Sequence, residues 1–286
     1  MPFEPPVESP ASLTDAYRLL TDGGAAWRPV AGGTDLLVQI TGELGPPPDR
    51  VLNIWGLNEL RGINLEGDEL VIGALTTYTD LRTSALVGEL VPALAAASAT
   101  IGAAQIQNRG TIGGNLANAS PAGDTLPIWL ATDTRVVLGS AAGERSVPAT
   151  EFFTGYRETA RRDDELVLRV RVPLLPRRHV RFRKVGTRRA QAISKVVMAL
   201  SWLTGADGAW YDTRLALGSV AATPVRARVT EAALDGNHPV AVSADAAVAA
   251  LESEITPIDD VRSTAEYRKL VAGRVLHRLI REEGGW

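Results

Sequence analysis

A long stretch of small and polar residues, from Gln107 to Asp124, constrains this 286-residue chain more than any other segment. It is dense in Gly, Asn, Thr and Ser, carries few charges, and contains the pair Gly113-Gly114 shortly after Thr111. A loop of this length inside a compact domain is usually functional or disordered. Because apolar segments flank the stretch, we expect a functional loop.

A second glycine pair, Gly32-Gly33, lies between an expected strand at residues 27–30 and an expected helix. Followed by Thr34, such a turn exposes successive backbone N–H groups and a hydroxyl to one point, which suits a phosphate. The pair fits neither the GxGxxG nor the GxxxxGK[ST] pattern, so a simple Rossmann or P-loop site is not supported. A purely structural turn is the alternative.

Together the two glycine segments could hold two phosphates. A pyrophosphate between them, with Asp124 accepting hydrogen bonds from sugar hydroxyls, is the arrangement that a dinucleotide needs. A buried connection packed on the alanine-rich helix before Gln107 is the competing interpretation.

The absence of cysteine excludes several kinds of site from this chain. Disulfides, thiolate nucleophiles, thiolate zinc sites and cysteine-ligated iron–sulfur clusters all need a residue that it lacks, so any such centre must lie on another subunit. The three histidines, His179, His238 and His277, form no metal-binding or Ser-His-Asp pattern, and no metal site is expected. A net charge of −3 argues against nucleic acid as a partner.

The sequence shows neither a secretory signal nor a membrane span, and we therefore expect a cytoplasmic protein. Residues 1–6 have neither the basic nor the apolar region of a secretory signal. The least charged stretch, residues 90–106, is mostly alanine and is interrupted by Pro92 and Gly102, so we expect a buried helix there and no membrane span.

Periodicity and turn residues predict two domains of α+β type. We expect a boundary in the proline-bearing segment 173–178, which gives domains at residues 1–176 and 177–286. In the first domain the pattern predicts helices at 12–21, 75–86 and 91–103, and strands at 27–30, 51–54, 69–73, 134–138, 145–147 and 166–172, the last as an edge or half-buried strand. In the second it predicts extended segments at 180–185, 192–202 and 210–219, then helices at 223–234, 245–254 and 263–281.

Four motifs in order, AGGTDLL, NRGTIGGNLANASPAGD, FFTGYRET and FRKVGTRRAQAISKV, resemble the FAD-binding (medium) subunit of the xanthine dehydrogenase and carbon monoxide dehydrogenase family of molybdenum hydroxylases. The resemblance spans essentially the whole chain, and KVGTRRAQAIS is closer to the xanthine type. It implies a PCMH-type FAD-binding domain of two α/β subdomains. A C-terminal domain with a three-stranded antiparallel sheet and a helix bundle would follow.

The resemblance also implies which residues bind FAD. The two glycine segments would hold the pyrophosphate, Asn118 and Asp124 would contact ribityl and ribose hydroxyls, Ile101 would lie near the adenine, and Lys184 would lie near the flavin ring. Lys184 is one of only three lysines, and a cation there would stabilise negative charge on the reduced ring. The implied set is Val30, Ala31, Gly32, Gly33, Thr34, Asp35, Leu36, Ile101, Thr111, Gly113, Gly114, Asn115, Asn118, Asp124 and Lys184, with no catalytic residue on this chain.

Within this set we expect Gly114 to be the most sensitive position, because a phosphate against the N–H groups of residues 113–115 would leave no space for a Cβ. The loop 185–193 would lie at the flavin face. Phe152 and Phe153 read as core residues, and Tyr156 as either a domain-junction residue or part of an NAD pocket. Twelve basic residues against four acidic ones between Arg157 and Arg189 read mostly as a solvated face that could also attract NAD phosphates.

The function implied is electron transfer. Electrons would pass from a molybdopterin-binding large subunit through two [2Fe-2S] clusters on a small subunit to FAD on this chain, and then to NAD or another acceptor. Two alternatives stay open: a standalone FAD-dependent oxidase or dehydrogenase on the same fold, and a non-catalytic flavin-binding or assembly protein. The sequence does not name the substrate.

Overall fold

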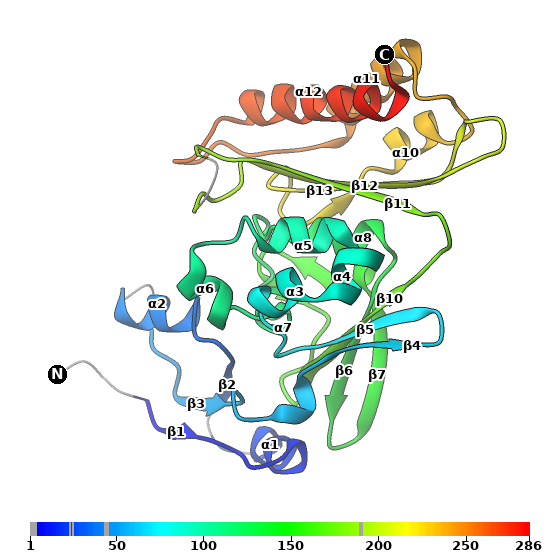
Figure 1. Ribbon diagram of the computed structural model, residues 1–286. Helices are drawn as coiled ribbons and strands as arrows, with labels where there is room; N and C mark the ends of the chain where they lie inside the picture. The colour runs from blue at the N-terminus through cyan, green and yellow to red at the C-terminus, as the bar shows by residue number, and fades with distance from the viewer. Residues whose placement is uncertain (1–4, 23, 25, 43–45, 189–190) are drawn as a thin grey trace.

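The computed structural model describes residues 5–22, 24, 26–42, 46–188 and 191–286 (Figure 1). The chain begins with a small parallel sheet in the order β1-β3-β2, formed by β1 (Val7–Glu8), β2 (Trp27–Val30) and β3 (Arg50–Asn53). Helix α1 (Leu13–Leu20) begins after Ser12, whose side chain accepts a hydrogen bond from the Asp15 N–H. Helix α2 (Leu36–Thr41) follows the first glycine pair, as expected.

A five-stranded antiparallel sheet forms the centre of the first domain, in the order β4-β5-β10-β6-β7. Its strands are β4 (Ile63–Glu66), β5 (Glu69–Gly73), β6 (Arg135–Ser140), β7 (Gly143–Pro148) and β10 (Leu166–Pro173). Of the two interpretations offered for residues 166–172, an edge strand or a half-buried strand, the edge strand is excluded because β10 has neighbours on both sides. Its charged positions are accommodated on the sheet surface, where Arg169 pairs with Glu144 and Arg171 with Glu69. Strand β4 was not predicted.

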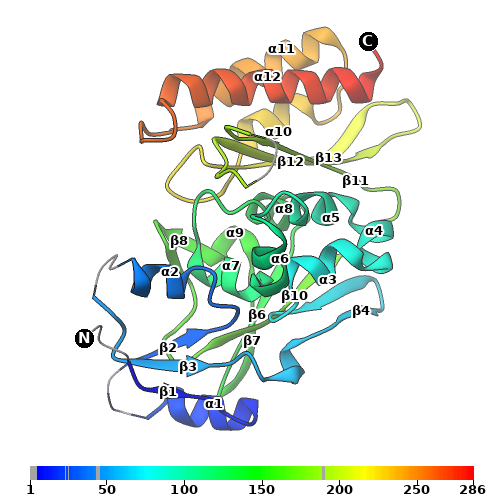
Figure 2. The ribbon, with the colours of Figure 1, turned by 60° about the vertical axis from the view of Figure 1, so that its left-hand side comes forward.

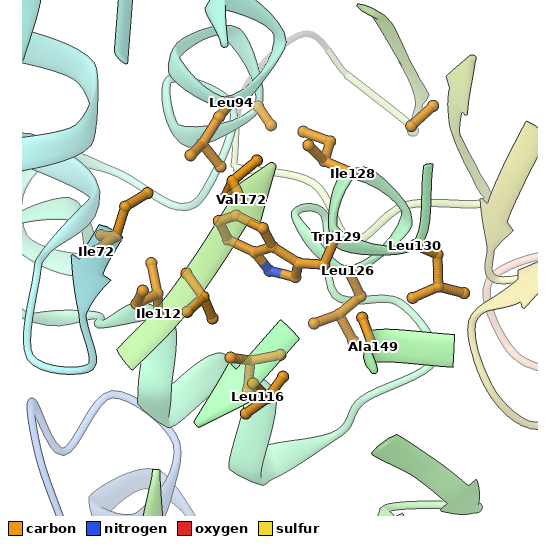
Figure 3. Packing of buried hydrophobic residues seen from close by; sticks show 14 of the residues in the cluster. Ile72, Leu94, Ile112, Leu116, Leu126, Ile128, Trp129, Leu130, Ala149 and Val172 are labelled. Carbon is orange, nitrogen blue, oxygen red and sulfur yellow. The ribbon is translucent and has the colours of Figure 1, made fainter. Parts of the chain in front are cut away.

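Helices cover one face of this sheet and enclose the largest core. They are α3 (Tyr78–Thr83), α4 (Ala85–Leu90), α5 (Pro92–Ser98), α6 (Ala104–Arg109), α7 (Ile112–Asn118), α8 (Leu126–Ala131) and α9 (Ala149–Phe152), with a 3-10 turn η1 (Asn58–Leu60) before β4. Trp129 of α8 is fully buried at the centre of this core, between Leu94, Ile112 and Leu116 (Figure 3). The expected helix at 75–86 starts only at Tyr78 and gives way to α4 after Ser84.

The segment 107–124 is not the continuous loop that we expected. Helix α6 extends to Arg109 and α7 begins at Ile112, with Thr111 Oγ1 accepting a hydrogen bond from Gly114 N at 3.1 Å. Glycine disfavours a helix by about 1 kcal/mol per residue relative to alanine. Complete burial of Ile112 and Leu116 offsets that cost. Ala119 ends α7 in a left-handed conformation, with φ of 46°.

The second domain is a sheet in the order β11-β12-β13-β14, formed by β11 (His179–Val185), β12 (Val196–Thr204), β13 (Trp210–Gly218) and the two-residue β14 (Val225–Arg226). Helices α10 (Arg228–Leu234), α11 (Ala241–Glu254) and α12 (Ala265–Gly284) lie on its outer face (Figure 1). Alternate residues of β12 face opposite cores: Val197 and Ala199 join the core of the first domain, whereas Met198 and Leu200 pack under the outer helices. Burial on both faces explains the continuous apolar run.

The expected linker connects the end of β10 to the start of β11. Within the first domain, a short hairpin of β8 (Phe153–Gly155) and β9 (Glu158–Thr159) precedes β10. Within the described ranges, no helix is both long and apolar enough to cross a membrane.

Candidate functional site

The two glycine segments line one cavity of about 140 Å³. Residues 30–36 form one part of its wall, and residues 111, 113–115 and 118 form another. Figure 2 shows α2, which follows the first segment, and α7, which contains the second glycine pair, near each other. The structure therefore brings together the expected first and second loops, although they lie far apart in the sequence.

The first glycine loop is open on its cavity side. Gly33 has φ of 78°, a conformation that favours glycine. Among the described residues, no acceptor pairs with the backbone N–H groups of Gly32, Gly33 or Thr34. A turn with free N–H groups is a ready site for an anion, and in this respect the loop fits the pyrophosphate of FAD.

The second loop differs from the first, because its N–H groups are used inside the protein. Ile112 N donates to Thr76 O at 3.1 Å, Gly113 N to Ala74 O at 2.8 Å, and Gly114 N to Thr111 Oγ1 at 3.1 Å. Asn115 N donates to Thr111 O at 3.0 Å. The N–H groups of residues 112–115 therefore all have acceptors within the protein, and their expected contact with a pyrophosphate stays a prediction. Thr111 and the first turn of α7 form a wall of the cavity.

The glycines of the two segments differ in how much space a side chain would find. A Cβ on Gly113 would lie 2.7 Å from the Ala74 Cβ, whereas one on Gly114 would meet only the Thr111 hydroxyl at 3.0 Å. A Cβ on Gly32 would lie 1.6 Å from the backbone oxygen of Arg109. Protein atoms therefore leave more space for a side chain at Gly114 than we expected. Among Gly32, Gly113 and Gly114, it is Gly32 that has the least space.

A stack of side chains holds the first loop against α6. The ring of Trp55 lies between the guanidinium groups of Arg109 and Arg61, at 3.9 and 4.4 Å from their carbons. Arg109 Nε also donates to Gly32 O at 3.3 Å, and Arg61 donates to the backbone oxygens of Leu75 and Trp55. Sequence reasoning missed this stack, since its members come from three separate segments.

A larger cavity of about 520 Å³, the outer cavity, adjoins the cavity of about 140 Å³, the inner cavity. Arg28, Asn118 and Arg161 line both. Asn118 Oδ1 accepts a hydrogen bond from Arg157 at 2.7 Å, and Arg157 lines only this outer cavity. Burial lowers the pKa of the Arg161 guanidinium, and the nearby positive charge of Arg28 contributes to the same shift. Neither Arg28 nor Arg161 was predicted individually, although Arg161 belongs to the basic run noted in the sequence.

Asp124 and Lys184 form a buried ion pair outside the lining of both cavities. Lys184 Nζ is 2.5 Å from Asp124 Oδ2 and donates to Thr100 O at 3.1 Å, and the two charged side chains are 9% and 8% exposed. Burial raises the pKa of Asp124 to about 6, although Lys184 opposes the rise. Asp124 Oδ1 is buried without a hydrogen-bond partner among the described residues.

Ile101 follows a residue that contacts Lys184. Its neighbour Thr100 contacts Lys184, so Ile101 lies at the Lys184 end of the site. An extended dinucleotide has its two ring systems at opposite ends, so the two expected placements, Ile101 near the adenine and Lys184 near the flavin ring, stay predictions. The loop expected at the flavin face includes residues 189 and 190, which lie outside the described residues.

Two aromatic features complete the comparison with the expectations. Phe152 and Phe153 are buried, which confirms them as core residues, whereas Tyr156 is 64% exposed after β8 and is no core residue. Tyr78 lines the inner cavity, and burial raises the pKa of its hydroxyl group. Sequence reasoning missed Tyr78, which lies in the first turn of α3 after the capping residue Thr77.

Family models match both parts of the chain. The FAD binding domain in molybdopterin dehydrogenase matches residues 2–175, and the CO dehydrogenase flavoprotein C-terminal domain matches residues 181–283. The carbon monoxide dehydrogenase medium chain of Hydrogenophaga pseudoflava is 33% identical, covering 95% of this chain and 94% of the relative. The glyceraldehyde dehydrogenase medium chain of Sulfolobus acidocaldarius is 34% identical over 91% of both chains. The xanthine dehydrogenase FAD-binding subunit of Escherichia coli O157:H7 is 32% identical, covering 95% of this chain and 93% of the relative.

Solved structures agree with these relatives. Carbon monoxide dehydrogenase from Hydrogenophaga pseudoflava superposes with a TM-score of 0.92 at 32% identity, covering 97% of this chain and 96% of that chain. Quinoline 2-oxidoreductase from Pseudomonas putida 86 gives the same TM-score at 26% identity, covering 99% and 98%. The expected fold class, an FAD-binding domain followed by the C-terminal domain, is confirmed.

Proposed function

This chain belongs to the FAD-binding subunits of molybdenum hydroxylase-type dehydrogenases and is an oxidoreductase subunit, and on that premise we propose that it passes electrons from [2Fe-2S] clusters of a partner subunit to NAD or another acceptor. The observation that carries the proposal is the cavity between the two glycine segments, with free N–H donors on one wall. FAD, when bound, supplies a carrier that accepts electrons singly and releases them as a pair.

The chain's own residues divide the work of holding FAD. The loop 30–36 binds the pyrophosphate through the N–H groups of Gly32, Gly33 and Thr34. The segment 111–115 fixes the width of the cavity, and Asn118 borders the adjoining outer cavity. We place Lys184 beside the flavin ring, and the place of Ile101, whose neighbour Thr100 contacts Lys184, stays a prediction.

Lys184 and Asp124 act on the flavin end through charge and hydrogen bonding. The Lys184 ammonium stabilises negative charge on the ring, and the Asp124 carboxylate orients that ammonium by accepting its hydrogen bond. The contact of Asp124 with a ligand hydroxyl stays a prediction. No nucleophile or general base is required of this chain. Its task is to bind, orient and tune the cofactor.

The partners in this proposal are a large subunit with the molybdopterin cofactor and a small subunit with two [2Fe-2S] clusters. The chain contains no cysteine, so it supplies no thiolate ligand to a cluster. Several relatives are named as medium chains, which agrees with a multi-subunit assembly. A role for exposed Tyr156 in NAD binding and the domain boundary at residue 176 both stay predictions.

A flavin-binding comparison tests the proposal. Cofactor-free protein, alone and co-purified with its partner subunits, is titrated with FAD and FMN, and the reduction of bound FAD by the reduced iron–sulfur partner is followed by absorbance. We expect one FAD per chain, a clear preference over FMN, and reduction through the partner. Equal affinity for the two flavins would contradict the pyrophosphate site. Reduction by a small organic substrate without partners would favour a standalone oxidase or dehydrogenase.

A further inference from the structure

We propose that Arg28 and Arg161 are specificity-determining residues that recognise the phosphate-bearing half of the dinucleotide. The inference rests on the proposed function and adds to it the source of positive charge. The glycine loop supplies N–H donors but no formal charge, whereas a pyrophosphate diester carries two negative charges. Cations at the loop add formal positive charge to these donors and favour such a ligand over an uncharged flavin.

Position is the first argument. Arg28 lies in β2, two residues before the end of the strand that leads into the first glycine loop, and Arg161 lies in the segment between β9 and β10. They are the only basic residues in the described lining of the inner cavity, and both also line the outer one. An extended anion that passes from one cavity to the other would therefore pass both guanidinium groups.

The second argument is that both charges are unpaired. Neither arginine forms an ion pair with a carboxylate in the described parts of the chain. Asp163, Glu165 and Asp164 act on Arg161 through charge, but none of them forms an ion pair with it in the described parts of the chain. Glu165 is occupied, because it binds Arg145 through two hydrogen bonds of 2.6 and 2.8 Å and accepts another from Arg162 N. The described lining of the inner cavity contains one acidic residue, Asp35, and two arginines. The described lining of the outer cavity contains one acidic residue, Glu158, and three arginines.

The third argument is that Arg161 is fixed in place without being neutralised. Its Nη1 donates to two backbone carbonyls, Arg162 O at 2.7 Å and Glu165 O at 2.8 Å. These bonds orient the guanidinium group but add no negative charge. Because Arg28 lies close enough to lower the pKa of Arg161, the pair repel each other, and an anion between them removes that repulsion.

The experiment uses cofactor-free protein in its assembled complex and three variants, Arg28→Gln, Arg161→Gln and the control Arg18→Gln. Arg18 is exposed on α1 and lines neither cavity. Binding of FAD, ADP and riboflavin is measured by calorimetry at low and high salt. ADP carries the pyrophosphate without the flavin, and riboflavin carries the flavin without phosphate.

We expect each lining variant to bind FAD and ADP about 10- to 100-fold more weakly, the loss expected for one charge-assisted hydrogen bond. Riboflavin binding should be unchanged, and the salt dependence of ADP binding should become less steep. The Arg18 variant should match the wild type in all three measurements.

Unchanged ADP binding in Arg28→Gln, or an equal loss of riboflavin and ADP, would overturn the inference. If Arg161→Gln fails to fold because its carbonyl contacts are lost, the exposed Arg28 variant decides alone. A wild-type protein without preference for FAD over riboflavin would instead sink the proposed pyrophosphate site, so the two failures are distinguishable.

Discussion

Gly32 and Arg109 meet through their backbones: a Cβ built on Gly32 would lie only 1.6 Å from the carbonyl oxygen of Arg109. Arg109 is the last residue of α6 and lies two residues before Thr111, where the second glycine segment starts. The contact between Gly32 and Arg109 therefore fixes the distance between the two glycine segments that line the cavity. Any side chain at Gly32 must push these segments apart.

Gly32→Ala should therefore destabilise the protein by about 3 kcal/mol, as overpacking of a close contact does, and should abolish FAD retention. Urea denaturation and the flavin content of purified protein measure the two effects. Gly114→Ala is the matched control, because its Cβ meets only the Thr111 hydroxyl and alanine favours a helix by about 1 kcal/mol over glycine. Normal FAD content in the Gly32 variant would show that the loops tolerate a wider gap.

The Trp55 stack should contribute to the same spacing. Removing the guanidinium in Arg109→Ala deletes a cation–π contact, which contributes about 0.5 to 2 kcal/mol, and the hydrogen bond to Gly32 O. We expect faster FAD dissociation, with partial rescue in Arg109→Lys, which keeps the charge but not the planar stack. Stopped-flow displacement of FAD measures the rate. Equal dissociation rates in the wild type and Arg109→Ala would show that the stack does not position the loop.

Breaking the buried pair should cost more than removing it. Lys184→Met leaves the Asp124 carboxyl group buried without its cation, and we expect a loss of about 3 kcal/mol in the free energy of unfolding. The double variant Asp124→Asn/Lys184→Met should lose clearly less. Denaturation of cofactor-free protein provides the comparison, and a double variant no more stable than Lys184→Met would argue against this coupling.

The same lysine should affect the bound flavin. Without the cation, the negative charge on the reduced ring is less stabilised, so Lys184→Met should lower the flavin potential. Spectroelectrochemistry on the FAD-loaded complex measures the shift, with Lys195→Met as a control lysine that contacts the Tyr267 ring. An unchanged potential with FAD still bound would place Lys184 away from the ring.

Asp124 should also give the fold a specific pH dependence. Its pKa is raised from 3.8 to about 6, so the folded protein holds this proton more tightly than the unfolded chain. Its contribution to stability is therefore greatest below pH 3.8 and is lost as the pH rises through about 6, a change of about 3 kcal/mol. The free energy of unfolding of the wild type minus that of Asp124→Asn should fall over this range, and a constant difference would contradict the raised pKa.

The sequence by itself determined the parts of this protein that depend on local chemistry. The pair Gly32-Gly33 predicted a strand, turn and helix, because only glycine readily adopts the φ of 78° at residue 33. The sequence predicted extended segments where β12 and β13 lie, and the lack of cysteine excluded cysteine ligands to a cluster. The four ordered motifs indicated the family, which the comparisons confirmed.

Only the tertiary structure decided which polar groups are free to bind. Gly113 N is occupied because Ala74, at the end of β5, packs against α7, and no local pattern reports a contact between such distant segments. Likewise, β10 is central because β5 and β6 both pair with it, and Arg28 and Arg161 come together only when β2 lies beside the segment before β10. Local sequence restricts the backbone of each segment, whereas the satisfaction of donors, charges and strand edges depends on what the rest of the chain places beside it.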